Sequence, residues 1–172
     1  MQMLVLSEKV PQGMEGVTFD KILKYAMAFE SEFDKIHVIT SHDYSARAGV
    51  SEKLRFHRAG WRETGGFLGI FTHILYLANV FCTGFQILRK EKDIAIVTNS
   101  WGHCTMGLLA VALAKIMHRK SIVRVAGGLE VGAITAERRY GLSINAVLLM
   151  LERTTFRRSD LIISVSESIF ET

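Results

Sequence analysis

Residues 93–128 read DIAIVTNSWGHCTMGLLAVALAKIMHRKSIVRVAGG, and the pattern within this stretch decides the fold class. It opens with Ile94 to Val97, a β-branched run without polar alternation, as is typical of a strand covered on both faces of a parallel sheet. A helix capped by Ser100 or Thr105 is predicted next. Its apolar positions recur on one side at helical spacing: Leu108, Leu109, Ala112, Leu113, Ile116 and Met117.

The helix closes with positive charge at His118, Arg119 and Lys120, which suits the negative end of a helix dipole. A second apolar strand, Ile122 to Ala126, follows. Strand, crossover helix and parallel strand form a unit that is nearly always right-handed. Because ligands of open parallel sheets lie beyond the carboxyl ends of the strands, Asn99 to His103 and Gly127 to Glu130 are predicted to line one crevice.

The rest of the chain repeats this alternation of strands and helices. Further strands are predicted at Met3 to Leu6, Ile36 to Thr40, Leu54 to His57 and Leu161 to Val165. Further helices are predicted from near Thr18, burying Phe19, Ile22, Leu23, Ala26, Phe29 and Phe33, and from about Ser143 to Arg158, burying Val147, Leu148, Leu151 and Thr155. The sequence thus predicts a single α/β domain over 1–172, a Rossmann-like, doubly wound parallel sheet with helices on both faces.

Composition narrows the class of protein. With 172 residues, 49% of them hydrophobic, and one proline, the chain is predicted to be globular rather than disordered. A net charge of +4 is compatible with phosphate-bearing ligands, an anionic membrane surface or nucleic acid. Two cysteines cannot build a disulfide framework or a four-ligand zinc site, and no secretory leader is visible. A cytoplasmic location is therefore expected, with peripheral contact to the inner face of the membrane left open.

The stretch from Phe67 to Leu88 carries no formal charge over twenty-two residues, long enough to cross a bilayer. Small and polar residues recur along it at three- and four-residue steps: Gly69, Thr72, His73, Tyr76, Asn79, Thr83 and Gln86. We expect a helix whose apolar side, with Phe71 and Ile74, lies on the sheet while the polar stripe faces a cleft or an interface. Basic residues beside it are candidate membrane-surface contacts: Arg58, Arg62, Arg89, Lys90 and Lys92, with Trp61.

The loop after the first strand contains Gly13 and Gly16, whose backbone N–H groups could approach a phosphate or a sugar. The alternative is that these glycines only make a turn. The segment QGMEG lacks the dinucleotide-binding fingerprint and the lysine–hydroxyl pair of a P-loop. Nicotinamide cofactors and simple nucleotide hydrolysis are therefore disfavoured.

Three runs in this order, NSWGHCTMGLLAVALAK, IVRVAGG and LERTTFRRSDLIISVSES, resemble the amino-terminal half of glycosyltransferase family 4, the retaining GT-B enzymes. The last run is the most specific, through Glu152, Arg157, Arg158, Asp160, Val165, Ser166 and Glu167. The likeness covers the whole chain and is firmest over residues 93–168. Gly13 to Gly16 match the family's glycine loop, which lies against the donor phosphate and the reacting sugar.

The resemblance implies that this domain binds the acceptor, and that a second, carboxy-terminal Rossmann-like domain, not included in this sequence, binds the nucleotide sugar. Gly13 and Gly16 are then assigned to the donor-facing loop. Acceptor or phosphate contacts are assigned to Ser100, Trp101, Gly127, Gly128, Glu130, Arg138 and Arg139. Ala126 stands where many members have a histidine, so His103 is the catalytic candidate unless the subfamily works without one. Each of these residues also has an alternative structural role. Trp101 could serve in packing, His103 could make a local hydrogen bond at the start of a helix, and Arg138 and Arg139 could lie in a solvated turn.

The leading function is therefore transfer of a sugar from a nucleotide-sugar donor to a glycan or lipid-linked acceptor, with no metal or cofactor and no nucleic acid. The isolated domain is expected to be inactive without its donor-binding partner, supplied in cis or in trans. The alternative is a non-catalytic α/β module that docks a partner subunit or a membrane. A nucleotide-binding α/β protein ranks third, because the phosphate-loop signatures are absent.

Overall fold

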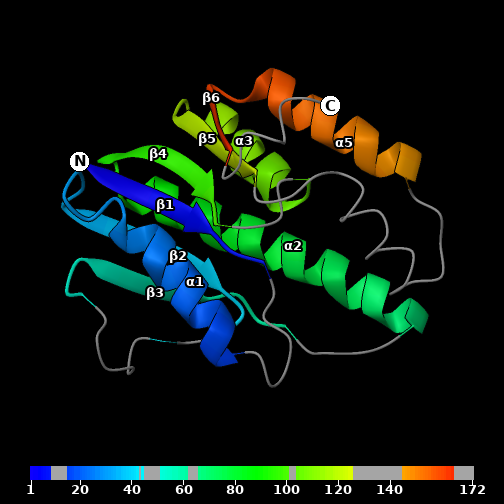
Figure 1. Cartoon of the computed structure of the whole chain (residues 1–172), viewed down its shortest axis with the longest axis horizontal. Helices are drawn as coiled ribbons and strands as arrows, with labels where there is room; N and C mark the ends of the chain where they lie inside the picture. Colours follow the sequence, from blue (N-terminus) through cyan, green and yellow to red (C-terminus); the bar gives the residue numbers. More distant parts are fainter. Residues whose placement is uncertain are drawn as a thin grey trace.

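The computed structural model describes residues 1–8, 15–42, 44, 51–61, 66–100, 104–125 and 145–164. The strands are β1 (Gln2–Leu6), β2 (Lys35–Thr40), β3 (Leu54–Arg58), β4 (Ile94–Asn99), β5 (Lys120–Val125) and β6 (Leu161–Ser164). The helices are α1 (Glu15–Met27), α2 (Gly66–Lys90), α3 (Met106–Ile116) and α5 (Asn145–Arg158) (Figure 1).

The six strands form one parallel sheet in the order β3-β2-β1-β4-β5-β6. This is the predicted α/β class with the doubly wound order, in which the chain moves outward from β1 to one edge and then from β4 to the other. The point of reversal lies between β1 and β4, where Leu6 pairs with Asn99. The carboxyl ends of these two strands therefore frame the crevice expected of such sheets.

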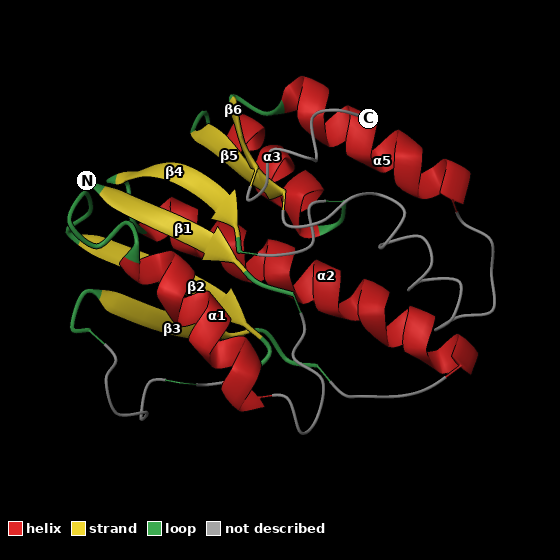
Figure 2. Ribbon diagram, viewed as in Figure 1, coloured by secondary structure: helices red, strands yellow, loops and turns green. Residues whose placement is uncertain are grey.

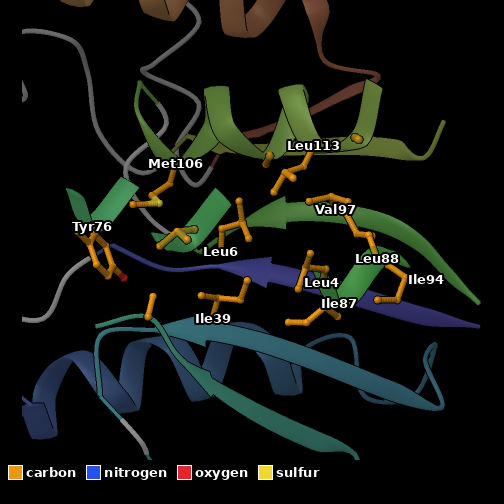
Figure 3. Close-up of a cluster of buried hydrophobic side chains, with 14 residues drawn as sticks. Leu4, Leu6, Ile39, Tyr76, Ile87, Leu88, Ile94, Val97, Met106 and Leu113 are labelled. Carbon is orange, nitrogen blue, oxygen red and sulfur yellow. The ribbon is translucent and has the colours of Figure 1, made fainter. Parts of the chain in front are cut away.

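Successive side chains of β1 point to opposite faces of the sheet, so the core is divided between the two faces. Met3 and Val5 pack with Ile22 and Ala26 of α1, whereas Leu4 and Leu6 pack with side chains of α2 and α3 (Figure 3). Helix α5 lies beside α3, with Phe156 against Val111, Val123 and Val125. Figure 2 shows α1 in front of the sheet and α2 and α3 behind it. Helices thus lie on both faces, as predicted.

Helix α3 ends in a left-handed turn at His118, which has a φ of 53°. The His118 N–H donates to the Lys115 carbonyl at 3.3 Å, and the Arg119 N–H donates to the Ala114 carbonyl at 2.7 Å. This pair of bonds is the Schellman motif, which usually places glycine at the left-handed position. The turn lets the chain enter β5 at Lys120, so Lys120 is the first residue of a strand and not, as predicted, part of the helix end.

Asp160, part of the sequence run that resembled the glycosyltransferases most closely, has a structural role. Its carboxylate accepts bonds from the Ser121 N–H at 2.9 Å, the Ser121 hydroxyl at 2.8 Å and the Lys115 ammonium at 3.2 Å. These donors hold the pKa of Asp160 well below its usual range. The carboxylate thereby fastens the start of β6 to the start of β5.

The predicted boundaries of α1 and the predicted buried side of α5 needed correction, whereas the predicted extent of α5 agrees with Asn145–Arg158. Helix α1 begins at Glu15, before Thr18, and ends at Met27, so Phe29 and Phe33 lie beyond it, although Phe33 is buried. Helix α5 exposes Val147, which was expected to be buried, and buries Thr155 as expected. Glu152 is buried beside it.

The predicted inward faces of α3 and α2 were partly wrong, although Leu113 lies in the core and Leu109 and Phe81 pack against it as predicted. Helix α3 buries Met106, Ala110, Leu113 and Ala114 and exposes Ile116. Along α2 the buried side carries Gly69, Tyr76, Val80 and Gly84, while Phe71 and Ile74 are exposed. Both helices carry apolar residues on more than one side, so the apolar pattern does not determine which side faces the sheet. Small residues allow close approach, and the Tyr76 hydroxyl donates to the Ser7 carbonyl at 2.8 Å.

Within the described residues, one helix, Leu68–Lys90, is long and apolar enough to cross a membrane by length and composition. Its mean hydropathy is 1.5, and 22% of its most apolar window is buried in the protein. Tyr76 and Val80 have no exposed surface, and Leu88 is also buried in the core. One side of α2 is therefore a structural part of the sheet domain.

Candidate functional site

The candidate site is the crevice at the carboxyl ends of β1 and β4. Beyond β1, the Ser7 N–H donates to the Ile39 carbonyl at 2.9 Å, and beyond β4 the Ser100 N–H donates to the Leu6 carbonyl at 2.9 Å. The chain then leaves β1 for α1 on one face of the sheet and leaves β4 for α3 on the other. Open parallel sheets bind their ligands where the chain diverges in this way, so we take this end of β1 and β4 as the candidate crevice.

Asn99 fixes the crevice wall on the β4 side. Its side-chain Oδ1 accepts from the Arg124 N–H at 2.9 Å, and its Nδ2 donates to the Arg124 carbonyl at 3.0 Å. The amide thus continues the β4–β5 pairing beyond the last backbone pair, Thr98 with Ile122. Replacing this side chain would leave two partly buried backbone groups of Arg124 without their partner, so Asn99 positions the wall.

Arg124 places a half-buried positive charge at the same end of the sheet. Its guanidinium donates to the Ser100 carbonyl and lies 4.8 Å from the centre of the Tyr25 ring. Burial lowers the pKa of Arg124, and the Tyr25 group opposes that shift. The Tyr25 hydroxyl is hydrogen-bonded to the Thr98 hydroxyl at 2.9 Å. Helix α1, β4 and β5 are therefore joined by one polar network beside the crevice.

A second polar group lies where β1 meets the start of α3. The Thr105 hydroxyl is 3.4 Å from Glu8 Oε1, and Thr105 is the N-cap residue of α3 without a side-chain bond to its backbone. Burial raises the pKa of Cys104 to about 12, and the charges of Glu152 and Glu8 add to this rise. Cys104 is therefore a protonated thiol and a poor nucleophile at neutral pH. At the switch point, Glu8 provides a partly exposed carboxylate.

Two of the predicted site residues fall within the described part of the chain. Ser100 lies at the carboxyl end of β4, as predicted, but it is buried, and its hydroxyl has no hydrogen-bond partner among the described residues. Gly16 lies in the first turn of α1 and not in the preceding loop. Outside the described residues lie His103, Gly13, Trp101, Gly127, Gly128, Glu130, Arg138 and Arg139.

Sequence reasoning missed Glu8, Thr105 as a partner of Glu8, and Arg124. The signal for Glu8 was available, because it comes two residues after the first strand and therefore at the carboxyl edge of the sheet. Arg124 could not be recognised in the same way, because its charge lies within an apolar strand. Only the structure shows the Tyr25 ring that covers it.

Among the described residues there is no group of three or more His, Cys, Asp or Glu side chains that could hold a metal ion. A surface depression of about 490 Å³ lies at the opposite edge, lined by Ala95, Lys115, His118, Arg119, Lys120 and Asp160. Two of its cations, Lys115 and Lys120, already pair with Asp160. The depression is thus remote from the switch point, and we do not take it as the site.

The sequence matches no protein-family model and no curated protein. The structure, however, is similar to solved glycosyltransferases. A UGT transferase from Siraitia grosvenorii in complex with UDP matches with a TM-score of 0.57 and 13% identity, over 95% of this chain and 44% of that one. MurG from Acinetobacter baumannii matches with a TM-score of 0.56 and 9% identity, over 98% and 42% of the two chains.

The chain has the fold of one half of a GT-B glycosyltransferase. A third structure, Phytolacca americana UGT2 with UDP-2-fluoro-glucose and pterostilbene, matches with a TM-score of 0.58, 6% identity, and coverage of 95% and 47%. The chain thus spans less than half the length of each of these GT-B structures. At such low identities the likeness concerns the fold, which confirms the predicted Rossmann-like GT-B half. The specific resemblance to family 4 remains a prediction.

Proposed function

We propose that this chain is the acceptor-binding domain of a retaining glycosyltransferase that moves a sugar from a nucleotide sugar to a glycan or lipid-linked acceptor. The observation that carries the proposal is the sheet order with its reversal between β1 and β4, combined with the match to half of GT-B structures, two of them solved with UDP or a UDP-sugar analogue. The sequence resemblance to family 4 supports the retaining, acceptor-binding assignment.

In this proposal the described residues divide the work at the crevice. Glu8 offers a carboxylate that can accept a hydrogen bond from an acceptor hydroxyl, and thereby orient that hydroxyl for attack. Asn99 and Arg124 hold the wall that carries Ser100. The first turn of α1, with Gly16, directs the positive end of its helix dipole to this edge. Stabilisation of the departing diphosphate is assigned to a separate donor-binding domain, and no metal or cofactor is needed.

Amide hydrogen exchange with candidate acceptors tests where this domain binds. We expect lipid-linked and free glycan acceptors to protect amides at the carboxyl edge, around Ser7, Glu8 and Thr105, and to leave those around Ser121 unchanged. Glu8→Gln keeps the shape but removes the charge, so it should weaken acceptor binding at least several-fold. Asp34→Asn, which removes an exposed carboxylate at the other end of the sheet, is the matched control. Protection confined to the amino-terminal edge would contradict the proposal.

A non-catalytic docking module is the second candidate. It is favoured by the apolar residues that α2 exposes to solvent, since such patches often mark interaction surfaces. The two candidate functions differ in what they require at the carboxyl edge of the sheet. A glycosyltransferase domain must bind an acceptor in the β1–β4 crevice, whereas a docking module needs no ligand there. Unchanged exchange at that edge with every acceptor, in a folded chain, would favour the module.

A further inference from the structure

Helix α2 exposes a row of apolar side chains on the side that faces away from the sheet, and the exposed polar residues Asn79 and Gln86 interrupt this side toward the end of the helix. Leu68 is 65% exposed, Phe71 and Ile74 are each 56% exposed, and Leu75 is 47% exposed. Ala78 and Cys82 continue the exposed row toward the end of the helix. We call these six residues the outer stripe. Apart from the neighbours Ile74 and Leu75, they recur at steps of three or four residues, which keeps them on one side of the helix.

The charges around the outer stripe are arranged asymmetrically. No residue from Gly66 to Leu88 is formally charged, and the helix then ends in the exposed cations Arg89 and Lys90. The Arg89 guanidinium lies 5.9 Å from the centre of the Phe85 ring. Arg119 adds a further cation by donating to the Lys92 carbonyl at 2.8 Å. Glu91 and Asp93 follow the helix, so this end stays positive overall while the stripe itself contains no acid.

We propose that the outer stripe docks this domain on an anionic lipid bilayer, with α2 lying in the plane of the interface. An uncharged row of large aliphatic and aromatic side chains on a helix that ends in cations is suited to insertion at the boundary between headgroups and acyl chains. Each basic residue near an anionic surface adds to the attraction, whereas acids along the stripe would oppose it. The exposed Leu68, Phe71, Ile74 and Leu75 side chains have no polar group that would require a protein partner.

The helix docks on the bilayer and does not span it. Its opposite side is fixed in the core by Tyr76, Val80 and Leu88, all nearly or completely buried, and by the bond from Tyr76 to Ser7. A helix that crossed a bilayer would lose these contacts with the sheet. Docking leaves them intact and removes only the outer stripe from water, which favours binding by about 25 cal/mol for each Å² of apolar surface buried.

The docked geometry also brings the crevice close to the lipid. Tyr76 is level with the carboxyl end of β1, so the ten residues from Gly66 to Leu75 project about 15 Å past that edge at 1.5 Å per residue. Figure 1 shows α2 extending beyond the arrowheads of β1 and β2. The most exposed part of the stripe thus lies on the same side of the molecule as the switch point, where the lipid-linked acceptor of the proposed function would bind.

Vesicle co-sedimentation of the 172-residue chain tests the proposal. We expect the chain to bind vesicles containing phosphatidylglycerol at least tenfold more strongly than pure phosphatidylcholine vesicles. The double variant Phe71→Gln/Ile74→Gln should lose at least tenfold in binding, and Arg89→Gln/Lys90→Gln should lose most of the preference for the anionic lipid. Met27→Gln is the matched control, because Met27 is 44% exposed on α1 at the opposite face of the sheet and should not affect binding.

Circular dichroism and thermal unfolding establish that each variant is folded, which the exposed positions allow. Failure of the chain to bind either vesicle would overturn the proposal, as would an equal loss of binding in Met27→Gln. Self-association that disappears in Phe71→Gln/Ile74→Gln, without vesicle binding, would instead assign the stripe to a second copy of the chain. The assay contains no sugar donor or acceptor, so its result is independent of the proposed glycosyl transfer.

Discussion

At the scale of single residues, the pair of buried His37 and half-buried His57 is the most informative feature away from the crevice. His37 Nδ1 and His57 Nε2 are 2.9 Å apart in a hydrogen bond, and His37 Nε2 is 3.1 Å from Gln2 Oε1. Burial and the neighbouring His57 lower the pKa of His37 to about 4, and burial also lowers the pKa of His57. Lys35 strengthens both shifts, whereas Glu91 opposes them. The folded chain therefore holds both rings neutral.

This pair predicts a loss of stability in mild acid. An unfolded histidine has a pKa of about 6.5, so between about pH 6.5 and pH 4 the unfolded chain binds more protons than the folded chain. Stability should fall as the pH falls through this window. We expect the free energy of unfolding to be lower at pH 5 than at pH 7.5 by on the order of 1–2 kcal/mol. Urea unfolding at the two pH values measures the difference.

The double variant His37→Gln/His57→Gln should remove most of this pH dependence, whereas His118→Gln, at an exposed turn, should preserve it. Asp160 does not contribute to the difference between the two pH values. Its pKa is lowered in the folded chain, so its contribution to the free energy of unfolding is fully present above about pH 4. If the double variant does not fold, the ring proton shifts of the unaltered chain give the same information. A His37 ring that titrates near pH 6.5 would contradict this interpretation.

At the scale of elements, Gly84 decides how closely α2 approaches its neighbours. A Cβ at this position would lie 2.8 Å from Leu113 Cδ1 of α3 and 3.5 Å from Ile39 Cδ1 of β2. We expect Gly84→Val to destabilise the fold by about 1–3 kcal/mol, because the added carbons overpack a buried contact. Ala78→Val, on the exposed side of the same helix, should cost well under about 1 kcal/mol. Equal shifts in the urea midpoint for the two variants would show that α2 does not pack this closely.

The same helix shows what the sequence could and could not predict. The existence of α2 followed from its long uncharged run, and the strands followed from short β-branched runs. The inward side of α2 did not follow, because Tyr76 and Thr72 were interpreted as a polar stripe, although tyrosine packs well when its hydroxyl finds a partner. That partner, the Ser7 carbonyl, is 69 residues away in the chain. Long-range polar contacts of this kind cannot be deduced from periodicity.

The candidate site was predictable to a similar degree. Its place at the carboxyl ends of β1 and β4 followed from the parallel order, and Ser100 lies where it was expected. Only the structure shows that the Asn99 side chain hydrogen-bonds the Arg124 backbone and that the Arg124 guanidinium lies over the Tyr25 ring. These contacts join three separate elements, so the pattern of any one element does not reveal them. A strand pattern identifies the edge at which a ligand binds, but it does not identify which side chains support that edge.

At the scale of the whole molecule, the central proposal is that this domain works with a second one, and it is supported by the sheet order and by the likeness to half of GT-B structures. The crevice described here has one wall, made from the carboxyl edge of a single sheet. Transfer requires the donor to be held against that wall while the diphosphate departs. The domain alone should therefore fold and bind acceptor without transferring sugar.

The most direct test is a transfer assay with a panel of radiolabelled nucleotide sugars and lipid-linked acceptors. The 172-residue chain is assayed alone and together with a separately supplied nucleotide-sugar-binding domain. We predict labelled product only in the mixture, with retention of anomeric configuration, and a loss of at least tenfold with Glu8→Gln. No product in either case, from a chain shown to be folded, would contradict the claim that this domain is half of a glycosyltransferase.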